Sequence, residues 1–457
     1  MNVKIKKLEE NGSFIKTSIG YLPLDWKVKS LIDVCKEKGL IRGPFGGALK
    51  KEFFVAEGYK VYEQKNAIYQ DAEIGDYYID EDKFNELKRF EVSEGDFIVS
   101  CSGTIGRIFR IPKGAKKGII NQALLLIKIN PQIISSDFFY QYFQWQGFQK
   151  RIIDNTQGGA MPNLVGMDIF KKTPIPLPPI EEQQKIADIL SIWDKAIELK
   201  EKLIEQKKEQ KKGLMQRLLT GKIRWNDGSK FSWREIKKRL EMISQGKVPE
   251  GYHKTQIGII PLEWRVKRLK DISKRVQREN DGNDHPVLTI SSLAGFLNQN
   301  ERFSKVIAGE NLSKYILLFK NEFAYNKGNS KTYPYGCVFR LEDYDRALVP
   351  NVYYCFEIVN GLSEFYKHYF LAGMLNKPLS RVINTGVRND GLLNLNFDDF
   401  FSLPIIVPPL VEQERIANIL TTADKEIQQL ERELEALKQQ KKGLMQLLLT
   451  GKVRVKC

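Results

Sequence analysis

The chain has 457 residues, of which 42% are hydrophobic and 11% aromatic, which excludes wholesale disorder and leaves room for roughly two to four domains. Its 72 Lys and Arg residues outnumber 56 Asp and Glu residues, and the net charge of +16 favours a polyanionic partner, nucleic acid before an anionic membrane. The five cysteines form no CxxC pair, the three histidines have no metal-ligand spacing, and every apolar run is too short to span a membrane. These features predict a cytoplasmic chain with reduced thiols and no zinc site.

The first predicted element is an opening arm, and the chain contains it twice. IGYLPLDW at residues 19–26 returns as IGIIPLEW at residues 257–264. Each arm is followed by about 150 residues in which strand-like runs alternate with Gly- and Asn-rich loops and short helices. The predicted strands are residues 96–100, 124–129, 315–319 and 352–358. The pattern predicts two α+β domains that begin alike and then diverge.

Each domain is followed by a long repeated segment. Residues 174–224 align without a gap to residues 404–454, with 29 identities in 51 positions at a constant offset of 230. Each copy starts with a proline-rich extended arm and ends at Gly221 or Gly451, which are typical helix stops. The first copy predicts a helix over residues 181–219, about 58 Å long at 1.5 Å per residue.

Apolar residues follow these helices in alternating steps of three and four, the pattern of a coiled-coil seam. The predicted seam comprises Ile186, Leu190, Trp193, Ile197, Ile204, Leu214 and Leu218 in the first copy, and Ile416, Leu420, Ile427, Leu430, Leu434, Leu437, Leu444 and Leu448 in the second. Lys200, Lys207 and Lys211 interrupt the first stripe, so we expect looser pairing there. We favour an antiparallel pair within the chain, and the alternative is that each helix packs on its own domain.

Several motifs together resemble one family. They are PPIEEQ at residues 178–183 and PPLVEQ at 408–413, the KKGLMQ and LLTGK endings, the opening arms, GPFGG at 43–47 and GDFIVSCSGT at 95–104. The chain is similar to the DNA-specificity (S) subunit of type I restriction-modification systems over nearly its whole length. The resemblance implies an α+β fold with two α/β target-recognition domains, separated by two long helices that the family conserves and that form an antiparallel coiled coil with a pseudo-twofold internal repeat.

The resemblance also implies how such a chain works. Each target-recognition domain would read one half of a bipartite site in double-stranded DNA. The helices would set the half-site spacing and dock two methyltransferase (M) subunits, through which restriction (R) subunits join. The chain itself would be non-catalytic and hold no cofactor, because S-adenosylmethionine, ATP and Mg²⁺ belong to its partners. The expected regions are a tail (1–16), domain 1 (17–175), helix 1 (176–223), a linker (224–254), domain 2 (255–405) and helix 2 (406–457).

Candidate DNA contacts are polar and basic residues on the loops of each domain, since such side chains bind base edges and phosphates. In domain 1 we predict Arg42, Gly46, Lys50, Gln64, Lys65, Asn66, Ser100, Ser102, Thr104 and Arg107. In domain 2 we predict Asn326, Lys327, Asn329, Ser330, Lys331, Thr332, Arg381 and Arg388. For each of these residues the alternative is an ordinary solvated loop.

Other motifs favour structural roles. The aromatic runs 138–143 and 365–370 could stack on bases, but their helical spacing favours core packing. Glu182, Gln183, Glu412 and Gln413 are expected to serve helix N-termini. The sequence contains no G-x-x-x-x-G-K-[ST] loop and no Asn/Asp-Pro-Pro-aromatic motif. Two alternatives remain: a coiled-coil interaction protein whose basic charge serves a membrane or an acidic protein, and a nuclease with unrecognised carboxylates.

Overall fold

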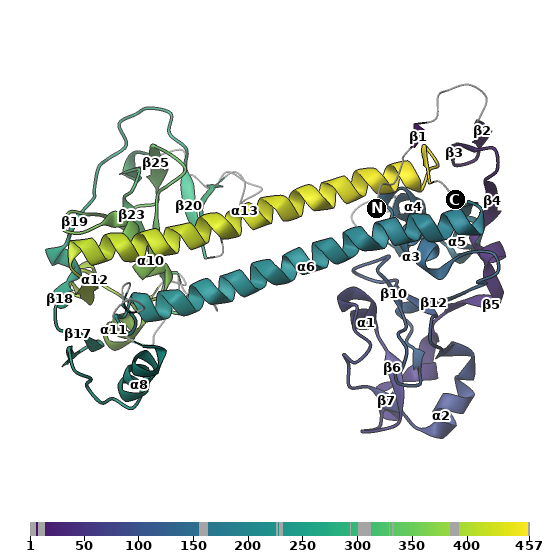
Figure 1. The fold of residues 1–457 in the computed structure, drawn as a ribbon, viewed down its shortest axis with the longest axis horizontal. Helices are drawn as coiled ribbons and strands as arrows, with labels where there is room; N and C mark the ends of the chain where they lie inside the picture. Colours follow the sequence, from purple (N-terminus) through teal and green to yellow (C-terminus); the bar gives the residue numbers. More distant parts are fainter. Residues whose placement is uncertain are drawn as a thin grey trace. The chain divides into compact units, whose positions relative to one another are not determined.

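The structure is a computed structural model that describes residues 6–7, 14–154, 163–224, 227, 232–292, 294–299, 312–328, 330, 333–383 and 393–455. The chain forms two compact units, one of residues 1–201 with 432–457 and the other of residues 202–431. Each unit therefore contains one α+β domain and parts of two long helices, α6 (Ile180–Leu218) and α13 (Leu410–Leu448), labelled in Figure 1.

The first unit is built on a four-stranded antiparallel sheet in the order β10-β9-β12-β5. Its strands are β5 (Cys35–Arg42), β9 (Phe97–Ser100), β10 (Ile108–Arg110) and β12 (Leu124–Ile129). The LLLIKI sequence of β12 is buried at five of its six positions, as expected for a central strand covered on both faces. The predicted strands at 96–100 and 124–129 are confirmed.

A second sheet in this unit, in the order β7-β6-β11-β8, contains one parallel pair, β6 with β11. Its strands are β6 (Tyr59–Tyr62), β7 (Tyr78–Ile79), β8 (Glu91–Val92) and β11 (Gly118–Ile120). The short helices are α1 (Gln64–Tyr69), α2 (Glu81–Glu86), α3 (Ser136–Gln144), α4 (Gln146–Ile152) and α5 (Met167–Lys172). Small strand pairs are β1 (Lys6–Lys7) with β28 (Val453–Arg454), β2 (Phe14–Thr17) with β3 (Gly20–Pro23), and β13 (Ile153–Asp154) with β14 (Asn163–Leu164).

The second unit repeats the central sheet but has no counterpart, among its described residues, of the second sheet. The sheet β24-β23-β26-β19 has the same order and antiparallel pairing as the first, and comprises β19 (Ser273–Arg275), β23 (Phe323–Asn326), β24 (Cys337–Arg340) and β26 (Tyr354–Ile358). Two further pairs replace the second sheet: β20 (Leu288–Ser291) with β21 (Gly295–Asn298), and β22 (Ile316–Phe319) with β25 (Arg346–Val349). The strands predicted at 315–319 and 352–358 are confirmed, and so is the divergence of the two interiors.

Further described elements of the second unit include a hairpin and several helices. The hairpin pairs β16 (Tyr252–Thr255) with β17 (Gly258–Pro261). The helices are α8 (Trp233–Ser244), α10 (Ser363–Leu371), α11 (Asn376–Val382) and α12 (Phe397–Phe401). Helix α8 lies inside the segment expected to be a linker. Its start is fixed by Ser232, which accepts a hydrogen bond from the Glu235 backbone while the Glu235 carboxylate accepts one from the Ser232 backbone.

The two aromatic runs lie on α3 and α10, and they are core residues rather than stacking platforms. Phe138, Phe139, Tyr142 and Phe143 are fully buried in one hydrophobic cluster. Phe365, Tyr366 and Tyr369 are buried in the corresponding cluster of the second unit. The cluster of the first unit also contains Ile186 and Leu190 of α6, together with Leu448 of α13. The beginning of one long helix and the end of the other therefore pack on the same domain core.

Each domain is tied to its helices by a repeated joint at the proline arm. The arm strand β15 (Pro174–Leu177) pairs with β4 (Lys27–Ser30), and β27 (Pro404–Val407) pairs in the same way with β18 (Arg265–Arg268). The buried Glu182 carboxylate accepts hydrogen bonds from Trp26 Nε1 at 3.0 Å and from Arg454 Nε at 2.7 Å. In the second unit the buried Glu412 carboxylate accepts from Trp264 Nε1 at 2.8 Å and from Arg224 NH2 at 2.8 Å. The Arg comes from the end of one long helical segment and the Glu from the start of the other.

The neighbouring glutamines complete each joint. Gln183 accepts a hydrogen bond from the backbone of Ser135 at 2.8 Å and donates to the Pro178 carbonyl at 2.9 Å. Gln413 accepts from the backbone of Leu362 at 2.8 Å and donates to the Pro408 carbonyl at 2.9 Å. In each unit, the Glu-Gln pair therefore links the first turn of one long helix to the domain and to the end of the other long helical segment.

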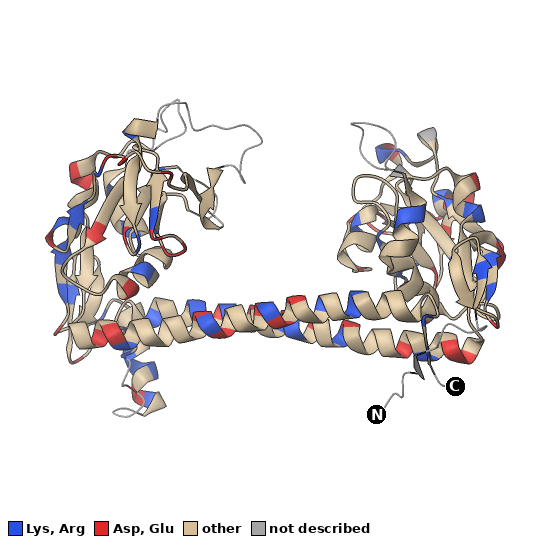
Figure 2. Ribbon diagram, turned by 90° about the horizontal axis from the view of Figure 1, so that it is seen from above, with Lys and Arg blue, Asp and Glu red and all other residues tan. Residues whose placement is uncertain are grey.

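Ion pairs run along the antiparallel helices in each unit, and several obey the 230-residue offset. Lys441 pairs with Asp194 in the first unit as Lys211 pairs with Asp424 in the second. Lys438 pairs with Glu201 at 2.6 Å, and Lys208 with Glu431 at 2.7 Å. In the ribbon of Figure 2, basic and acidic residues are interspersed along both helices.

The lysines that interrupt the first apolar stripe take part in the same helix pairing. Lys200 donates to Glu433 at 2.8 Å and Lys207 pairs with Glu426 at 2.6 Å, in addition to the Lys211 pair. The expected loosening is therefore wrong for these positions, because each lysine meets a carboxylate of α13. The predicted seam residues listed above are all buried or half-buried.

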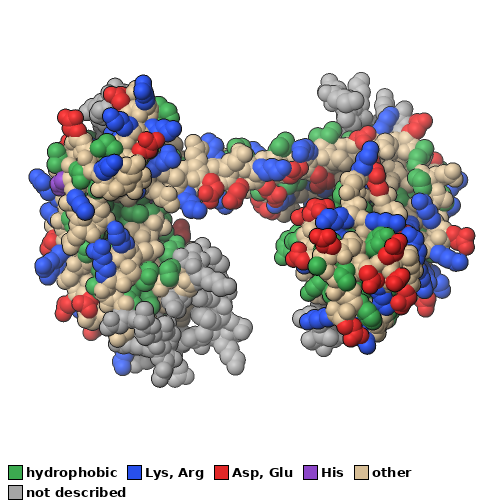
Figure 3. Space-filling model, turned by 90° about the horizontal axis from the view of Figure 1, so that it is seen from below, with side chains coloured by type: hydrophobic (Ala, Val, Ile, Leu, Met, Phe, Trp, Pro, Cys, Tyr) green, Lys and Arg blue, Asp and Glu red, His purple; other side chains and the backbone are tan. Residues whose placement is uncertain are grey.

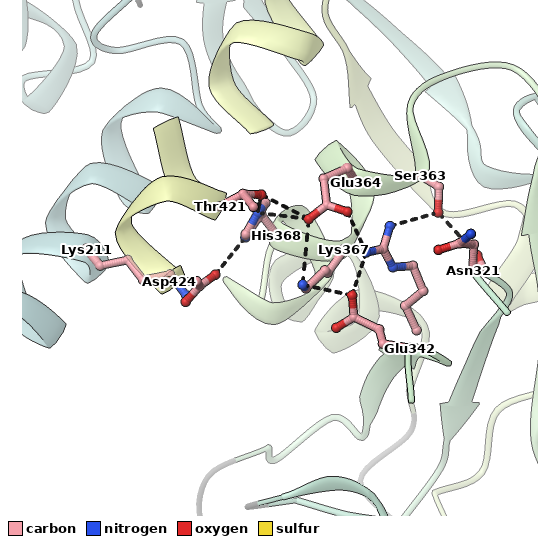
Figure 4. Close-up of polar contacts among 10 residues, drawn as sticks. Lys211, Asn321, Glu342, Ser363, Glu364, Lys367, His368, Thr421 and Asp424 are labelled. Atoms are coloured by element: carbon pink, nitrogen blue, oxygen red, sulfur yellow. Dashed lines mark hydrogen bonds and ion pairs between the residues drawn. The ribbon is translucent and has the colours of Figure 1, made fainter. Parts of the chain in front are cut away.

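A polar cluster around the buried His368 joins α10 to both long helices in the second unit (Figure 4). His368 Nε2 lies 3.1 Å from Thr421 Oγ1, and the Thr421 hydroxyl donates to Glu364 at 3.0 Å. Since that hydroxyl gives its proton to Glu364, His368 Nε2 is the donor and Nδ1 carries the lone pair. Nδ1 faces Asp424 at 3.8 Å, and Asp424 is the partner of Lys211.

The first unit has a glutamine where the second has this histidine. Gln141 of α3 donates to Asp194 at 2.7 Å, and Asp194 is the partner of Lys441. Burial lowers the pKa of His368 to about 4; Asp424 opposes this shift, and Lys211 adds to it. The histidine is therefore neutral at neutral pH, which suits a site with no exposed surface.

Candidate nucleic-acid interface

Three segments of the first domain bring predicted DNA contacts together at the loop between β9 and β10. Gln64, at the start of α1, accepts hydrogen bonds from the backbone N–H groups of Cys101 at 3.2 Å and Ser102 at 2.9 Å. Burial raises the pKa of the Cys101 thiol to about 12, and the Arg42 guanidinium at the end of β5 opposes that shift through a side-chain hydrogen bond. Arg42 and Gln64 therefore flank this loop.

The loop itself presents polar side chains to solvent. Ser102, Thr104 and Arg107 are exposed. Gly103 has φ +64° and Gly106 has φ +74°, which allows the tight left-handed turns that expose them. A flexible cation and two hydroxyls on an exposed turn have the chemistry to contact phosphates and base edges.

Asn66 and Ser100 are not accessible as DNA contacts. Both are fully buried. The Asn66 side chain accepts from the Glu63 backbone at 2.7 Å and donates to the carbonyls of Asp71 at 2.9 Å and Ile74 at 2.7 Å. Ser100 Oγ accepts from the Arg107 backbone at 3.0 Å. These side chains shape the loops from within, and neither can reach a base while this corner is folded.

The other candidates of domain 1 lie on neighbouring loops. Lys65 pairs with Glu63 at 2.9 Å, and Lys50 pairs with Glu52 at 3.5 Å with more than half of each side chain exposed. The exposed Lys50–Glu52 pair is weak and can be exchanged for a phosphate. Gly46 starts a short 3₁₀ turn, Gly46–Leu49, after the exposed Phe45.

The sequence did not single out a group of glutamines beside the same loop. A cavity of about 440 Å³ is lined by Thr104 and Arg107 together with Gln70, Gln144 and Gln149. Gln70 has φ +57° and its amide donates to the carbonyls of Ala67 and Ile108. Nothing in the spacing of these glutamines along the chain predicts that they meet, because α1, α3 and α4 bring them together.

In domain 2 the equivalent loop follows β23, as the first follows β9. Asn326 ends that strand and accepts from the backbone of Gly328 at 2.9 Å. Lys327 Nζ lies 4.8 Å from the centre of the Tyr354 ring, and Ser330 Oγ accepts from the Tyr333 backbone at 3.0 Å. The predicted contacts Asn329, Lys331, Thr332 and Arg388 lie outside the described residues.

Arg381 lies apart from this loop. It is on α11, and its guanidinium donates to the carbonyl of Gln256, in the turn between β16 and β17, at 3.1 Å. The structure therefore groups it with that hairpin rather than with Asn326 and Lys327. On the face drawn in Figure 3, basic side chains are mixed with acidic ones over both units.

Within the described part of the chain, no three His, Cys, Asp or Glu side chains come together as a metal site. None of the described helices is both long and apolar enough to cross a membrane.

The chain has two similar α+β domains. Each carries a polar loop after the same sheet strand, and each is joined to the duplicated helices. This arrangement defines a recognition scaffold with two binding domains. A family model for the type I restriction modification DNA specificity domain matches residues 23–208 and again residues 261–439. The chain belongs to this family, and it is a specificity subunit concerned with the recognition of DNA sequence.

Two curated relatives align with this chain over nearly their whole length. A putative type I restriction enzyme MjaX specificity subunit of Methanocaldococcus jannaschii is 27% identical over 481 residues, with 98% of each chain covered. The MjaIX specificity subunit of the same organism is 26% identical, again with 98% of each chain covered. A solved structure from a study of complex assembly and conformational transition of the type I R-M system has a TM-score of 0.51 at 13% identity, covering 94% of this chain and 99% of the other. That last likeness concerns the fold.

Proposed function

We propose that this chain reads a bipartite site in double-stranded DNA, with one target-recognition domain (residues 17–175) on one half-site and the other (residues 255–405) on the second. The observation that carries the proposal is the shared four-stranded sheet with a polar loop after β9 and after β23. The surroundings of these loops differ between the domains. A common frame with different loops suits two half-sites of different sequence.

The long helices are proposed to set the gap between the half-sites and to dock two methyltransferase subunits, through which restriction subunits join. Each helix has 39 residues, or about 58 Å at 1.5 Å per residue, which exceeds the roughly 34 Å of one duplex turn. The joints around Glu182 and Glu412 repeat the same residues and contacts, which is what binding two copies of one partner requires. The chain is proposed to act in the cytoplasm without catalysing a reaction, while its partners bind S-adenosylmethionine, ATP and Mg²⁺.

A domain exchange tests the proposal. Residues 17–175 are replaced by the equivalent domain of another family member, the chain is expressed with its partner subunits, and the methylated sequences of the host genome are read. We expect one half of the methylated motif to change while the other half stays. A change in both halves, or in neither, would contradict the modular assignment.

A second experiment tests the spacing role. A seven-residue insertion in the middle of α6, matched by one in α13, preserves the heptad register while lengthening both helices. We expect the same bases to be methylated across a longer gap. The purified chain should also leave duplex DNA uncut in Mg²⁺, whereas cleavage would favour the nuclease alternative. Absence of duplex binding, with or without M subunits, would favour a protein-interaction role.

A further inference from the structure

A cavity of about 490 Å³ in the second unit is bordered by four basic side chains. They are Lys222, after the end of α6, Lys254 of β16, and Lys377 and Arg381 of α11. Among the described residues that line the cavity, none is Asp or Glu. Four positive charges thus surround one space, and no lining residue that the structure describes carries a counter-charge.

These cations are available to a ligand. Lys222 is half-buried, and Lys254, Lys377 and Arg381 are exposed. Lys222, Lys254 and Lys377 make no ion pair with another described residue. Arg381 uses one N–H for the Gln256 carbonyl, at 3.1 Å, which anchors its guanidinium at the rim and leaves its other donors free of described partners.

Between the charges the lining is partly apolar and partly polar, the polar residues being Thr220, Thr255 and Gln256. Ile243, Ile257, Ile260 and Ile406 border the same cavity. A hollow with one sign of charge and partly apolar walls concentrates the electric field and raises the local concentration of counter-ions. Such a hollow favours an anion over water more strongly than the same charges spread over a convex surface.

The first unit lacks part of this arrangement. Lys452, Lys16 and Arg151 stand at the positions of Lys222, Lys254 and Arg381, but Gly147 stands at the position of Lys377. A Cβ atom at Gly147 would overlap the Trp145 ring, so no lysine fits there. Arg151 also donates to the Tyr142 hydroxyl at 3.2 Å.

We infer that the cavity bordered by Lys222, Lys254, Lys377 and Arg381 is a phosphate-binding site. Carboxylates bring one charge each, whereas successive phosphate groups bring several charges at short intervals, and both Lys and Arg bind them well. The bound phosphate groups belong either to the backbone of duplex DNA or to a free polyphosphate. In its DNA form the inference rests on the proposed function, and it predicts a contact that carries no sequence information.

The test compares wild type with K254Q/K377Q, which keeps Arg381 on its Gln256 anchor, and with K267Q/K270Q. The control pair removes the same charge from exposed lysines of the same unit that lie outside the cavity. Each full-length chain is purified with its partner subunits, and its thermal unfolding is checked. Binding is measured to duplex DNA at several salt concentrations and, separately, to inorganic tripolyphosphate.

If the phosphates belong to DNA, K254Q/K377Q binds specific and unrelated duplexes about tenfold more weakly, and the recognised sequence is unchanged. The magnitude of the slope of log K against log salt then falls by about 0.9 for each lost phosphate contact. If a free polyphosphate is the source, the variant loses tripolyphosphate binding at least tenfold and keeps DNA binding. The inference is wrong if the variant matches wild type for both ligands, or if the control loses as much. Failure of wild type to bind DNA would contradict the proposed function instead, and the tripolyphosphate arm would still decide the site.

Discussion

Arg454 and Glu182 form a two-pronged ion pair although 272 residues separate them in sequence, with Nε to Oε1 at 2.7 Å and NH2 to Oε2 at 2.8 Å. The glutamate is buried, and its carboxylate also accepts from Trp26. The pair therefore fastens the segment after α13 to the start of α6 and to the opening arm of domain 1.

Replacing Arg454 with Ala should destabilise the chain strongly, because it leaves the Glu182 charge buried with one donor. We expect a loss of about 3 kcal/mol in the free energy of unfolding, as for other buried pairs broken on one side. Chemical denaturation of the full-length chain measures this loss of stability. Lys195→Ala is the matched control, since its pair with Glu198 is exposed and should contribute well under 1 kcal/mol. Similar losses for the two variants would contradict the assigned role.

Lys211 and Asp424 should be energetically coupled. Their side chains are largely buried, at 16% and 27% exposed, whereas the Lys208–Glu431 pair nearby is 50% and 45% exposed. A double-mutant cycle with alanine at each position should give a coupling of about 1–2 kcal/mol for the first pair and under about 0.5 kcal/mol for the second. Equal couplings would mean that burial does not strengthen this seam.

His368 should make the stability of the second unit depend on pH. Its pKa is lowered to about 4 in the folded chain by burial, from an ordinary value of 6.5. As pH falls from 6.5 to about 4, the unfolded chain takes up a proton that the folded chain does not, so stability falls by up to about 1.4 kcal/mol per pH unit. Above pH 6.5 this contribution is constant.

His368→Gln is the matching variant, because Gln141 occupies the equivalent place and donates to Asp194. We expect its unfolding free energy to vary less with pH between 6.5 and 4 than that of wild type. Urea titrations at several pH values measure the difference. Parallel curves for the two proteins would show that His368 does not carry the effect.

Substitutions at Asn66 and at Arg107 should separate effects on folding from effects on DNA binding. Asn66→Ala removes three hydrogen bonds that the fully buried Asn66 amide makes to the backbone, and should cost about 3 kcal/mol of stability. Arg107→Ala should leave stability within about 0.5 kcal/mol and weaken binding to the DNA site by about 1–3 kcal/mol, through one half-site. Binding to duplexes altered in one half-site measures this, with the exposed Lys113→Ala as control. An equal loss in the control would assign the effect to net charge.

The sequence predicts the long helices well because their signals are local. Alternating apolar steps, a proline arm and a terminal glycine specify α6 to within one residue at each end. The seam lysines could not be interpreted in this way, since the partners of Lys200 and Lys211 lie 233 and 213 residues away. The candidate loop residues divide into buried and exposed ones, and for a related reason the sequence does not separate the two groups. Asn66 looks like any polar loop residue until the backbone folds around its amide.

The pairing of β1 with β28 has a topological consequence. Lys6 and Lys7 lie beside Arg454 and Val453 in one small antiparallel sheet, so the two ends of the described chain meet in the first unit. In the second unit the corresponding place, after α6, is crossed by continuous chain through α8 into β16. A short peptide joining the ends, with a new break between α8 and β16, would give a circular permutant in which the two domains change order while keeping every joint.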